Sequence, residues 1–518
     1  MSDRALAVVA PDPASRRAQD PSSRGTLARH RLLKSIRATV RRIPRAAWAC
    51  ALVAFLNAAC WSLITPPFQA PDEPSHFAYV EELAEAGRLP SSNEEHFSPA
   101  ENVVLEDLRQ GQVRYSPQNH TIFAAAQQRK LQHDLTLPLS RVSPNAGVAA
   151  SEPPLYYTLE TIPYYLGSGG TLLDRLVLMR LLSALIGALA VIFVFLFVRE
   201  ALPGAPWAWT VAGLGVAFSP LLGLMAGSVN SDVLLYTVSA ALFYCLARGF
   251  RRGLTPKLGF LTGIVIGAGL LTKVNFLGLV PGAILGLLVL TARARRDSRQ
   301  SAYRSLAIAL ATAATPAFLY VAINLLTGRH AYGTLSTGIS STTGKGSLLD
   351  EISYIWQFYL PRLPGMHSYF PDLPTTIKFW VNGFVGLYGW VDTVFPAWVY
   401  KVALIPVCLL VVLFASGLFL NRASLRPRLA ELSVYAVMLV GLAALVGASD
   451  YLEFPLATGS YAQPRYLLPT LALYGAVLCL AARGAGRRWG PVVGAWLVIL
   501  FIAHDIFSQL LEISRFYG

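Results

Sequence analysis

The sequence predicts an all-α polytopic membrane protein, a bundle of about eleven transmembrane helices with two large loops on the outer face. Its 518 residues are 54% hydrophobic and only 14% charged, and its mean hydropathy is +0.48. Apolar stretches of roughly 20 residues, the length needed to cross a hydrocarbon core, recur from Ala46 to Leu510. A soluble chain of two or three domains is less apolar than this.

The spans are placed where apolar runs are bounded by charged residues or by Gly and Pro. The predicted spans are 46–64, 174–198, 206–224, 232–248, 258–272, 276–291, 305–326, 396–420, 431–449, 466–482 and 489–510. Because their number is odd, the two ends of the chain lie on opposite sides of the membrane. The long stretches 65–173 and 327–395 then share one side.

Basic residues set the orientation. The net charge is +14, but the arginines punctuate the apolar segments instead of gathering on one folded domain, which argues against a nucleic-acid partner. They form an amino-terminal arm and four later clusters: Arg29 to Arg45, Arg248/Arg251/Arg252, Arg293/Arg295/Arg296/Arg299, Arg422/Arg426/Arg428 and Arg483/Arg487/Arg488. All five fall on one side, which the positive-inside rule makes cytoplasmic. Both long loops are therefore expected outside.

This orientation divides the chain into four parts. Residues 1–45 form a disordered basic cytoplasmic tail, without the pattern of a signal peptide. Residues 46–326 form a transmembrane module that would hold the catalytic centre, with the first outer loop at 65–173. Residues 327–395 form a second outer loop with interfacial helices, and residues 396–518 the carboxyl-terminal spans. The five cysteines lie in or beside apolar stretches and imply no disulfide framework.

The first outer loop opens with a helix. Pro74 suits a first turn, Asp72 or Glu73 suits the cap, and Gly87 suits the position after the end, which predicts a helix over 74–86. One face is apolar and the opposite face acidic: Phe77, Val80, Leu83 and Ala84 against Glu81, Glu82 and Glu85. Such a helix is expected to lie on the membrane surface or on other spans.

Asp72 and Glu73 are the sharpest candidates for chemistry. A base that takes a proton from a hydroxyl must stay ionised, and an Asp at a helix amino terminus is kept so by free N–H groups and the helix dipole. The alternative is that the two carboxylates only cap the helix, a common role. His76, one turn later, is expected to be a hydrogen-bonding partner and not a metal ligand.

Six short strings occur in order between residues 46 and 470. They are Ala70-Pro71-Asp72-Glu73-Pro74-Ser75-His76-Phe77-Ala78-Tyr79, Glu152-Pro153-Pro154-Leu155-Tyr156-Tyr157, Arg180-Leu181-Leu182-Ser183, Gly227-Ser228-Val229-Asn230-Ser231-Asp232, Leu271-Thr272-Lys273 and Pro464-Arg465-Tyr466-Leu467-Leu468-Pro469. Together they resemble the motifs of the GT-C superfamily of membrane glycosyltransferases. The resemblance is closest to bacterial protein-mannosyltransferase-like and aminoarabinose-transferase-like proteins, especially an uncharacterised branch of predicted membrane proteins. The chain departs from it at Glu152, where several relatives carry Lys or His.

The resemblance implies a GT-C-like bundle in a bacterial cytoplasmic membrane, with its active site on the outer face. It implies inverting transfer of a sugar from a polyprenyl-phosphate donor to an envelope glycan, lipid or protein. Asp72 would be the general base, with Glu73 beside it and Asp232 assisting. Asp72 and Asp232 are also where a divalent ion would bind, and metal dependence stays open because it differs across the superfamily. Asn230 and Glu152 join the substrate-binding candidates from their matching strings.

Cations near the interface suit a lipid-phosphate donor, because the leaving phosphate gains negative charge in the transition state. Lys273 and Arg465 are the first candidates and Arg180 the third. The alternative is that they snorkel to lipid headgroups. Tyr156 and Tyr157 are candidates for a sugar or lipid groove, although aromatic belts at bilayer interfaces are the commoner use of such residues.

Three other function classes remain open. A transporter or flippase of lipid-linked sugars would also have many spans, but its polar residues are expected near the midplane of two related halves, and no such halves are evident. A lipid-pyrophosphate-dependent glycan polymerase or ligase would carry arginine-rich outer loops, which this chain lacks. A non-catalytic glycan-binding scaffold would tolerate loss of Asp72.

Overall fold

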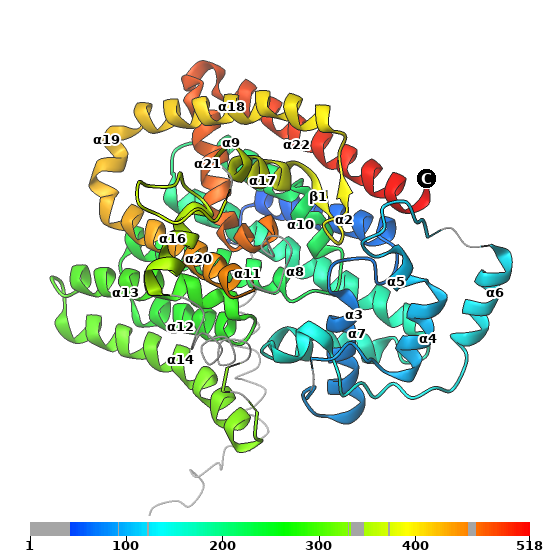
Figure 1. The fold of residues 1–518 in the computed structure, drawn as a ribbon. Helices are drawn as coiled ribbons and strands as arrows, with labels where there is room; N and C mark the ends of the chain where they lie inside the picture. Colours follow the sequence, from blue (N-terminus) through cyan, green and yellow to red (C-terminus); the bar gives the residue numbers. More distant parts are fainter. Residues whose placement is uncertain are drawn as a thin grey trace, which may run out of the picture.

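The computed structural model describes residues 42–518 except 92, 122–123, 330, 333–346, 371–372 and 454–462. Nearly all of the predicted tail therefore lies outside the described residues, as does the Ser/Thr/Gly-rich part of the second outer loop. Helices dominate the described chain (Figure 1). The fold class predicted from the sequence is confirmed.

Nine helices of the described chain are long and apolar enough to cross a membrane, three of them lengthened by a preceding helical turn. They are α2 (Arg45–Ile64), α8 (Leu172–Ala201), α11 (Asp232–Arg252), α13 (Val280–Ala294), α14 (Arg299–Leu326), α18 (Ala397–Leu420), α20 (Leu429–Glu453), α21 (Leu471–Gly484) and α22 (Gly486–Tyr517). A further span is broken, since α9 (Pro206–Ala217) and α10 (Pro220–Ala226) meet at 59°. The short apolar helix α12 (Pro256–Leu270) accounts for the last of the predicted spans.

Helices α8 and α11 form the centre of the bundle. They pack against each other, and α8 also packs against α2, α9 and α21. The apolar window of α11 is 83% buried and that of α8 is 72% buried, compared with 6% in α18 and 17% in α14. The apolar faces of α14 and α18 are thus left for lipid, as expected for peripheral spans.

The bundle has two chemically different ends. Helices α8 and α11 begin at one end, near Arg180 and Asp232, and finish at the other, where Glu200 pairs with Arg252. Arg428, just before α20, donates to the carbonyl of Ala201 at that same end. A helix of 20 residues is about 30 Å long, the thickness of a hydrocarbon core. Two of the basic clusters therefore meet at the end opposite to the predicted site.

The first outer loop contains α3 (Glu73–Glu81), α4 (Pro99–Asp107), α5 (Gln110–Val113), α6 (Ala125–Asp134) and α7 (Leu155–Leu166). Helix α3 continues as a π-helical turn, Glu82–Ala86, and stops at Gly87 with φ of 67°, so the predicted helix is confirmed. Of its two expected positions, on the membrane surface or on other spans, the first is wrong, because Glu81 and Glu82 are completely buried. The helix packs mainly against α7 of the same loop. The loop folds over both glutamates and supplies Arg88 and the Ser143 N–H as partners of Glu82.

The second outer loop contains α16 (Leu348–Gln357) and α17 (Leu373–Gly386), followed by a short hairpin that the sequence did not indicate. Its strands are β1 (Leu387–Tyr388) and β2 (Thr393–Val394), paired antiparallel with Leu387 opposite Val394. The hairpin contacts α22, and Trp390 in its turn meets Tyr115, which follows α5. Both outer loops thus converge at the end of the bundle that holds the candidate site.

Candidate active site

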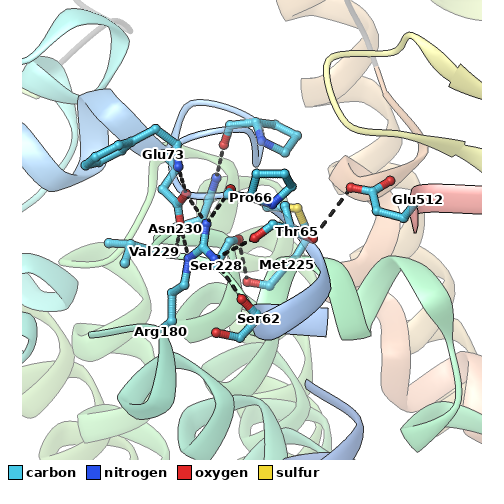
Figure 2. Close-up of polar contacts among 12 residues, drawn as sticks. Ser62, Thr65, Pro66, Glu73, Arg180, Met225, Ser228, Val229, Asn230 and Glu512 are labelled. Atoms are coloured by element: carbon cyan, nitrogen blue, oxygen red, sulfur yellow. Dashed lines mark hydrogen bonds and ion pairs between the residues drawn. The ribbon is translucent and has the colours of Figure 1, made fainter. Parts of the chain in front are cut away.

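A buried ion pair fixes the start of the first outer loop. Arg180 donates from Nε to Glu73 Oε1 at 2.8 Å and from Nη2 to Glu73 Oε2 at 2.6 Å (Figure 2). Its remaining donors bond the carbonyls of Ser62, Thr65 and Pro66 at 2.8 to 3.0 Å. A planar guanidinium suits such a set, because its donors form a rigid fork. Every nitrogen of Arg180 is thereby engaged within the protein.

The second outer turn is attached to the same carboxylate. Glu73 also accepts from the backbone N–H groups of Phe68 and Val229, at 2.9 and 3.0 Å. Asn230 donates to the carbonyl of Pro71 at 3.1 Å, and its side-chain oxygen accepts the Asp232 N–H at 2.9 Å. These bonds hold Asp72 and Asp232, distant in sequence, on adjacent loops.

Gly227 allows this close approach of the two loops. A Cβ at this position would lie 2.6 Å from the Ala58 carbonyl oxygen and 2.8 Å from the Ser62 nitrogen, both in α2. These are backbone atoms, which cannot swing away as a flexible side chain would. The turn that carries Asn230 and Asp232 therefore packs directly on the end of α2.

Asp72 differs from its neighbour Glu73 in conformation and exposure. It adopts a left-handed backbone conformation, φ 61° and ψ 7°, and its side chain makes no capping hydrogen bond to α3. The Asp72 side chain is 27% exposed, whereas that of Glu73 is fully buried. A non-glycine residue costs about 1–2 kcal/mol in this region of backbone space. The cap-only role does not fit Asp72, because its carboxylate is directed elsewhere.

The Asp72 carboxylate begins a row of alternating charges. Asp72 pairs with Arg465 at 2.7 Å, and Arg465 faces Asp232 at 4.0 Å. Lys273 then lies 2.9 Å from Asp232 and 3.7 Å from Glu152. The structure thus brings together five of the residues predicted from the sequence, contributed by five separate segments of the chain. Among them, Asp72 has the most exposed side chain.

This row keeps Asp72 ionised. Burial alone would raise the pKa of its carboxyl, but the charge of Arg465, the hydrogen bond that Arg465 donates and the charge of Lys273 lower that pKa. Burial and the nearby Lys273 lower the pKa of His76 to about 3. His76 is consequently neutral at physiological pH. Its Nδ1 lies 2.8 Å from the Tyr157 hydroxyl, which confirms the expected hydrogen-bonding role.

Tyr156 and Tyr157 are neighbours in the sequence, but their side chains contact different parts of the structure. Tyr157 stacks on Tyr79, with ring centroids 3.7 Å apart, and reaches the site through His76. Tyr156 turns to the α7–α8 contact, where its hydroxyl lies 2.7 Å from Ser183 Oγ. Ser183 in turn donates to Glu160 at 2.9 Å. The structure therefore places Tyr157 at the row of charges and Tyr156 in a neighbouring helix contact.

Three buried polar atoms of the row have no hydrogen-bond partner among the described residues. They are Arg465 Nε, Asp232 Oδ2 and Glu152 Oε2. Buried polar groups are nearly always paired, with protein or with water or a ligand. One donor and two acceptors in a single row suit a molecule with several hydroxyl groups.

The same residues do not fit a divalent ion as they stand. Asp72 faces Arg465 and Asp232 faces Lys273, and a metal ion would have to displace these cations. Within the described ranges, no three His, Cys, Asp or Glu side chains are grouped so that they could hold a metal.

A recess opens beside Arg465, and the sequence did not indicate several of its residues. Helix α10, the second outer loop and the turn before α21 form its walls. Its lining consists of Pro71, Leu221, Leu224, Met225, Leu387, Tyr388, Gly389, Val391, Gln463, Pro464 and Arg465. The hairpin could not be predicted from the sequence, because its strands have two residues each. Such short strands show no alternation of apolar and polar residues.

Comparisons with known proteins gave one matching family and several solved structures of similar fold. A family model described as "Predicted membrane protein (DUF2142)" matches residues 55–474, a range that contains every candidate site residue. No protein of curated function matches the chain. ArnT from Cupriavidus metallidurans, solved with undecaprenyl phosphate, is 12% identical over 91% of this chain and 73% of its own, with a TM-score of 0.44. The Archaeoglobus fulgidus oligosaccharyltransferase, solved with a tethered acceptor peptide, is 12% identical over 91% of this chain and 55% of its own, with a TM-score of 0.40.

Proposed function

The chain belongs to the DUF2142 family of predicted membrane proteins, and from this premise we propose that it is an inverting glycosyltransferase. It moves a sugar from a polyprenyl-phosphate donor to an acceptor of the cell envelope. The reaction takes place on the outer face of the bacterial cytoplasmic membrane. Family membership agrees with the branch of uncharacterised membrane proteins that the six sequence strings resemble.

One observation carries the proposal: an ionised, partly exposed Asp72 begins a row of charges that includes two cations at one end of a membrane bundle. Glycosyl transfer from a lipid phosphate needs a base for the acceptor hydroxyl and positive charge for the leaving phosphate. Asp72 supplies the first requirement. Arg465 and Lys273 supply the second.

The transfer step balances with these residues. The acceptor oxygen attacks the anomeric carbon of the donor sugar while its proton passes to Asp72. The bond between that carbon and the phosphate oxygen breaks, and polyprenyl phosphate leaves with one more negative charge. Attack from the side opposite to the phosphate inverts the configuration. Asp232 and Glu152 each have a carboxylate oxygen without a partner among the described residues, and these oxygens accept hydrogen bonds from the sugar hydroxyls.

Donor binding would also strengthen the base. In the free protein Arg465 lies 2.7 Å from Asp72 and helps to hold its pKa low, so Asp72 is a weak proton acceptor. A bound donor phosphate competes for the Arg465 guanidinium. As Arg465 turns to the phosphate, Asp72 loses part of its positive surroundings and its affinity for a proton rises. The acceptor hydroxyl is thus activated once the donor is in place.

Glu73 and Arg180 take a different role in this mechanism from the one expected from the sequence. Both side chains are buried, at 0% and 3% exposure, and their polar atoms bond one another and nearby backbone groups. Neither has an atom left for substrate. We assign them to positioning Asp72 and Asp232, with Asn230 completing the attachment.

The flippase alternative has one feature in its favour, the broken span formed by α9 and α10. Transporters usually contain a pair of such spans around a midplane site. Here the ionisable row lies at one end of α8 and α11, where a reaction with outer-face acceptors is more readily explained than passage across the bilayer.

The test uses purified protein with a panel of polyprenyl-monophosphate sugars and matched pyrophosphate donors, incubated with envelope glycan, lipid and protein fractions. Release of polyprenyl phosphate together with labelled acceptor supports the proposal. Movement of an intact lipid-linked sugar across vesicles without bond cleavage would replace it with a flippase. Exclusive use of pyrophosphate donors would replace it with a polymerase or ligase.

A further inference from the structure

An exposed aromatic ring stands near the proposed base and has no part in the mechanism above. Tyr115 follows α5 in the first outer loop, and it is 60% exposed. Its backbone is left-handed, with φ of 61°. A bulky residue in this conformation is uncommon and marks a position that the surroundings enforce.

The Tyr115 ring is held by residues of both outer loops. It meets the Trp390 ring edge-on, with centroids 5.5 Å apart and planes at 68°. The Arg114 guanidinium lies 4.7 Å from the Trp390 ring centroid and 5.1 Å from that of Tyr115. Glu95 accepts from Arg114 at 3.3 Å. The ring is therefore fixed at its edge and through Arg114, while much of its surface remains open.

Arg515 of α22 bonds residues of both outer loops. It donates to the carbonyls of Val113 and Asn119 at 2.8 and 2.7 Å, on either side of Tyr115. It also pairs with Asp392 at 2.7 Å, two residues after Trp390. The end of α22 thus joins the segment that carries Tyr115 to the hairpin that carries Trp390.

The hairpin that carries Trp390 reaches the recess beside Arg465. Gly389 and Val391, the neighbours of Trp390, line the same recess as Pro71 and Arg465. Burial raises the pKa of Tyr115, Arg114 opposes that rise, and the Asp72 carboxylate adds to it. The indole Nε1 of Trp390 has no hydrogen-bond partner among the described residues, although a buried Trp usually has one.

We propose that Tyr115 is a stacking platform for a sugar ring of the acceptor, so that the acceptor is a glycan. This inference rests on the proposed function and selects one of its three acceptor classes. One face of a pyranose is lined by C–H groups, which pack on an aromatic face, while its hydroxyls reach charged groups at the edge. An exposed aromatic ring flanked by an arginine and a carboxylate offers both kinds of contact.

A membrane-interface anchor explains these residues less well. In an interfacial belt the aromatic ring lies at the headgroup level with its polar tip in water. The neighbours of Tyr115 are instead Arg114 and the 48% exposed Glu95, both of which would lose water if the ring entered lipid. Tyr115 also belongs to a polar segment between α5 and α6.

The binding test uses saturation-transfer NMR on the full-length protein in detergent, with mannotriose, galactotriose and cellotriose as probes. Saturation is expected to reach the ring C–H protons of at least one trisaccharide. Tyr115→Ala should reduce the signal about fivefold or more, while Tyr115→Phe, which keeps the ring, should retain it. Tyr303→Ala is the matched control, because Tyr303 is 51% exposed and lies beside Arg295 at the start of α14, at the basic end of the bundle.

The kinetic test measures transfer to envelope glycan. Tyr115→Ala is expected to raise the KM for glycan acceptor about tenfold, the effect of losing one aromatic contact, without changing the KM for donor. Unchanged trisaccharide binding and acceptor KM in Tyr115→Ala would overturn the inference, as would equal loss in Tyr303→Ala. Because binding needs no turnover, Tyr115-dependent binding without any transfer would support the platform and contradict the proposed function.

Discussion

Glu73 and Asp72 are adjacent carboxylates with opposite surroundings. Glu73 is sealed in a two-point ion pair with Arg180, at 2.6 and 2.8 Å, whereas Asp72 is partly exposed and faces Arg465 at 2.7 Å. Both carboxylate oxygens of Glu73 are engaged in hydrogen bonds inside the protein, so Glu73 does not react. The Asp72 carboxylate is partly exposed and can exchange Arg465 for another partner. We therefore assign a positioning role to Glu73 and the chemical role to Asp72.

Breaking the buried pair should destabilise the protein. We expect Glu73→Gln to lower the free energy of unfolding by about 3–5 kcal/mol, because it leaves the Arg180 charge buried without its counter-ion. Thermal unfolding of the purified protein measures the change. Glu106→Gln, the same substitution at an exposed residue of α4, is the control and should change the melting temperature little. Equal melting temperatures for Glu73→Gln and the unaltered protein would contradict the positioning role.

The two cations of the row should act on the donor. Lys273→Ala and Arg465→Ala are each expected to raise the KM for the polyprenyl-phosphate sugar about 10- to 100-fold, the usual effect of losing a hydrogen bond to a charged group. The KM for acceptor should change less. Arg129→Ala, at an exposed cation of α6 in the first outer loop, serves as the control. A defect confined to the acceptor would reassign both residues.

The acidic residues buried in the first outer loop should make stability depend on pH. Burial raises the pKa of Glu81 to about 8, with the carboxylates of Glu101 and Glu85 nearby and Arg141 and Arg175 opposing the rise. An unfolded glutamate titrates near pH 4.5. Between these two values the unfolded state releases a proton that the folded state keeps, so stability is full below pH 4.5 and is lost as pH rises through 8.

Glu81→Gln removes the part of this dependence that comes from Glu81. Relative to the unaltered protein, the variant should gain stability between pH 5 and pH 8, by on the order of 1 kcal/mol or more, since one unit of pKa is worth about 1.4 kcal/mol. Melting curves across this range provide the measurement. The exposed residue Glu106 of α4 gives the control variant, Glu106→Gln. Parallel curves for Glu81→Gln and the unaltered protein would show that Glu81 is ionised in the fold.

Orientation in the membrane has a direct test. A cysteine at Ser91, in the first outer loop, should react with an impermeant reagent in intact cells, whereas cysteines at Ser298 and Ser424, beside basic clusters, should not. All three positions are exposed. Ser340 offers a further outer position and lies outside the described residues. Equal labelling at all positions would refute the outer-face orientation.

The spans could be predicted from sequence because their signal is local. A run of apolar residues long enough to cross a bilayer needs no knowledge of its neighbours. The position of α3 could not be predicted in this way. Its acidic face implied exposure, but Arg88 and the backbone of Ser143 cover Glu82 from outside the helix. Such burial depends on how the rest of the loop folds.

The candidate site was predictable only in part for the same reason. The six strings identified Asp72, Asp232, Lys273 and Arg465, and the structure joins them in one row. Which carboxylate faces which cation depends on contacts such as that of Asp72 with Arg465, 393 residues away. The pair of Tyr115 and Trp390 was missed because neither residue belongs to a motif: Tyr115 follows the short helix α5, and Trp390 lies in the turn between two strands of two residues each.

The central claim is that Asp72 removes the acceptor proton, and turnover by Asp72→Asn tests it most directly. Asn tolerates the left-handed conformation and keeps the shape of the side chain, but it is not a base. We expect the variant to melt near the temperature of the unaltered protein while the rate of sugar transfer falls by about two to four orders of magnitude. A fully active Asp72→Asn protein, assayed with the donor that the unaltered protein uses, would contradict the mechanism.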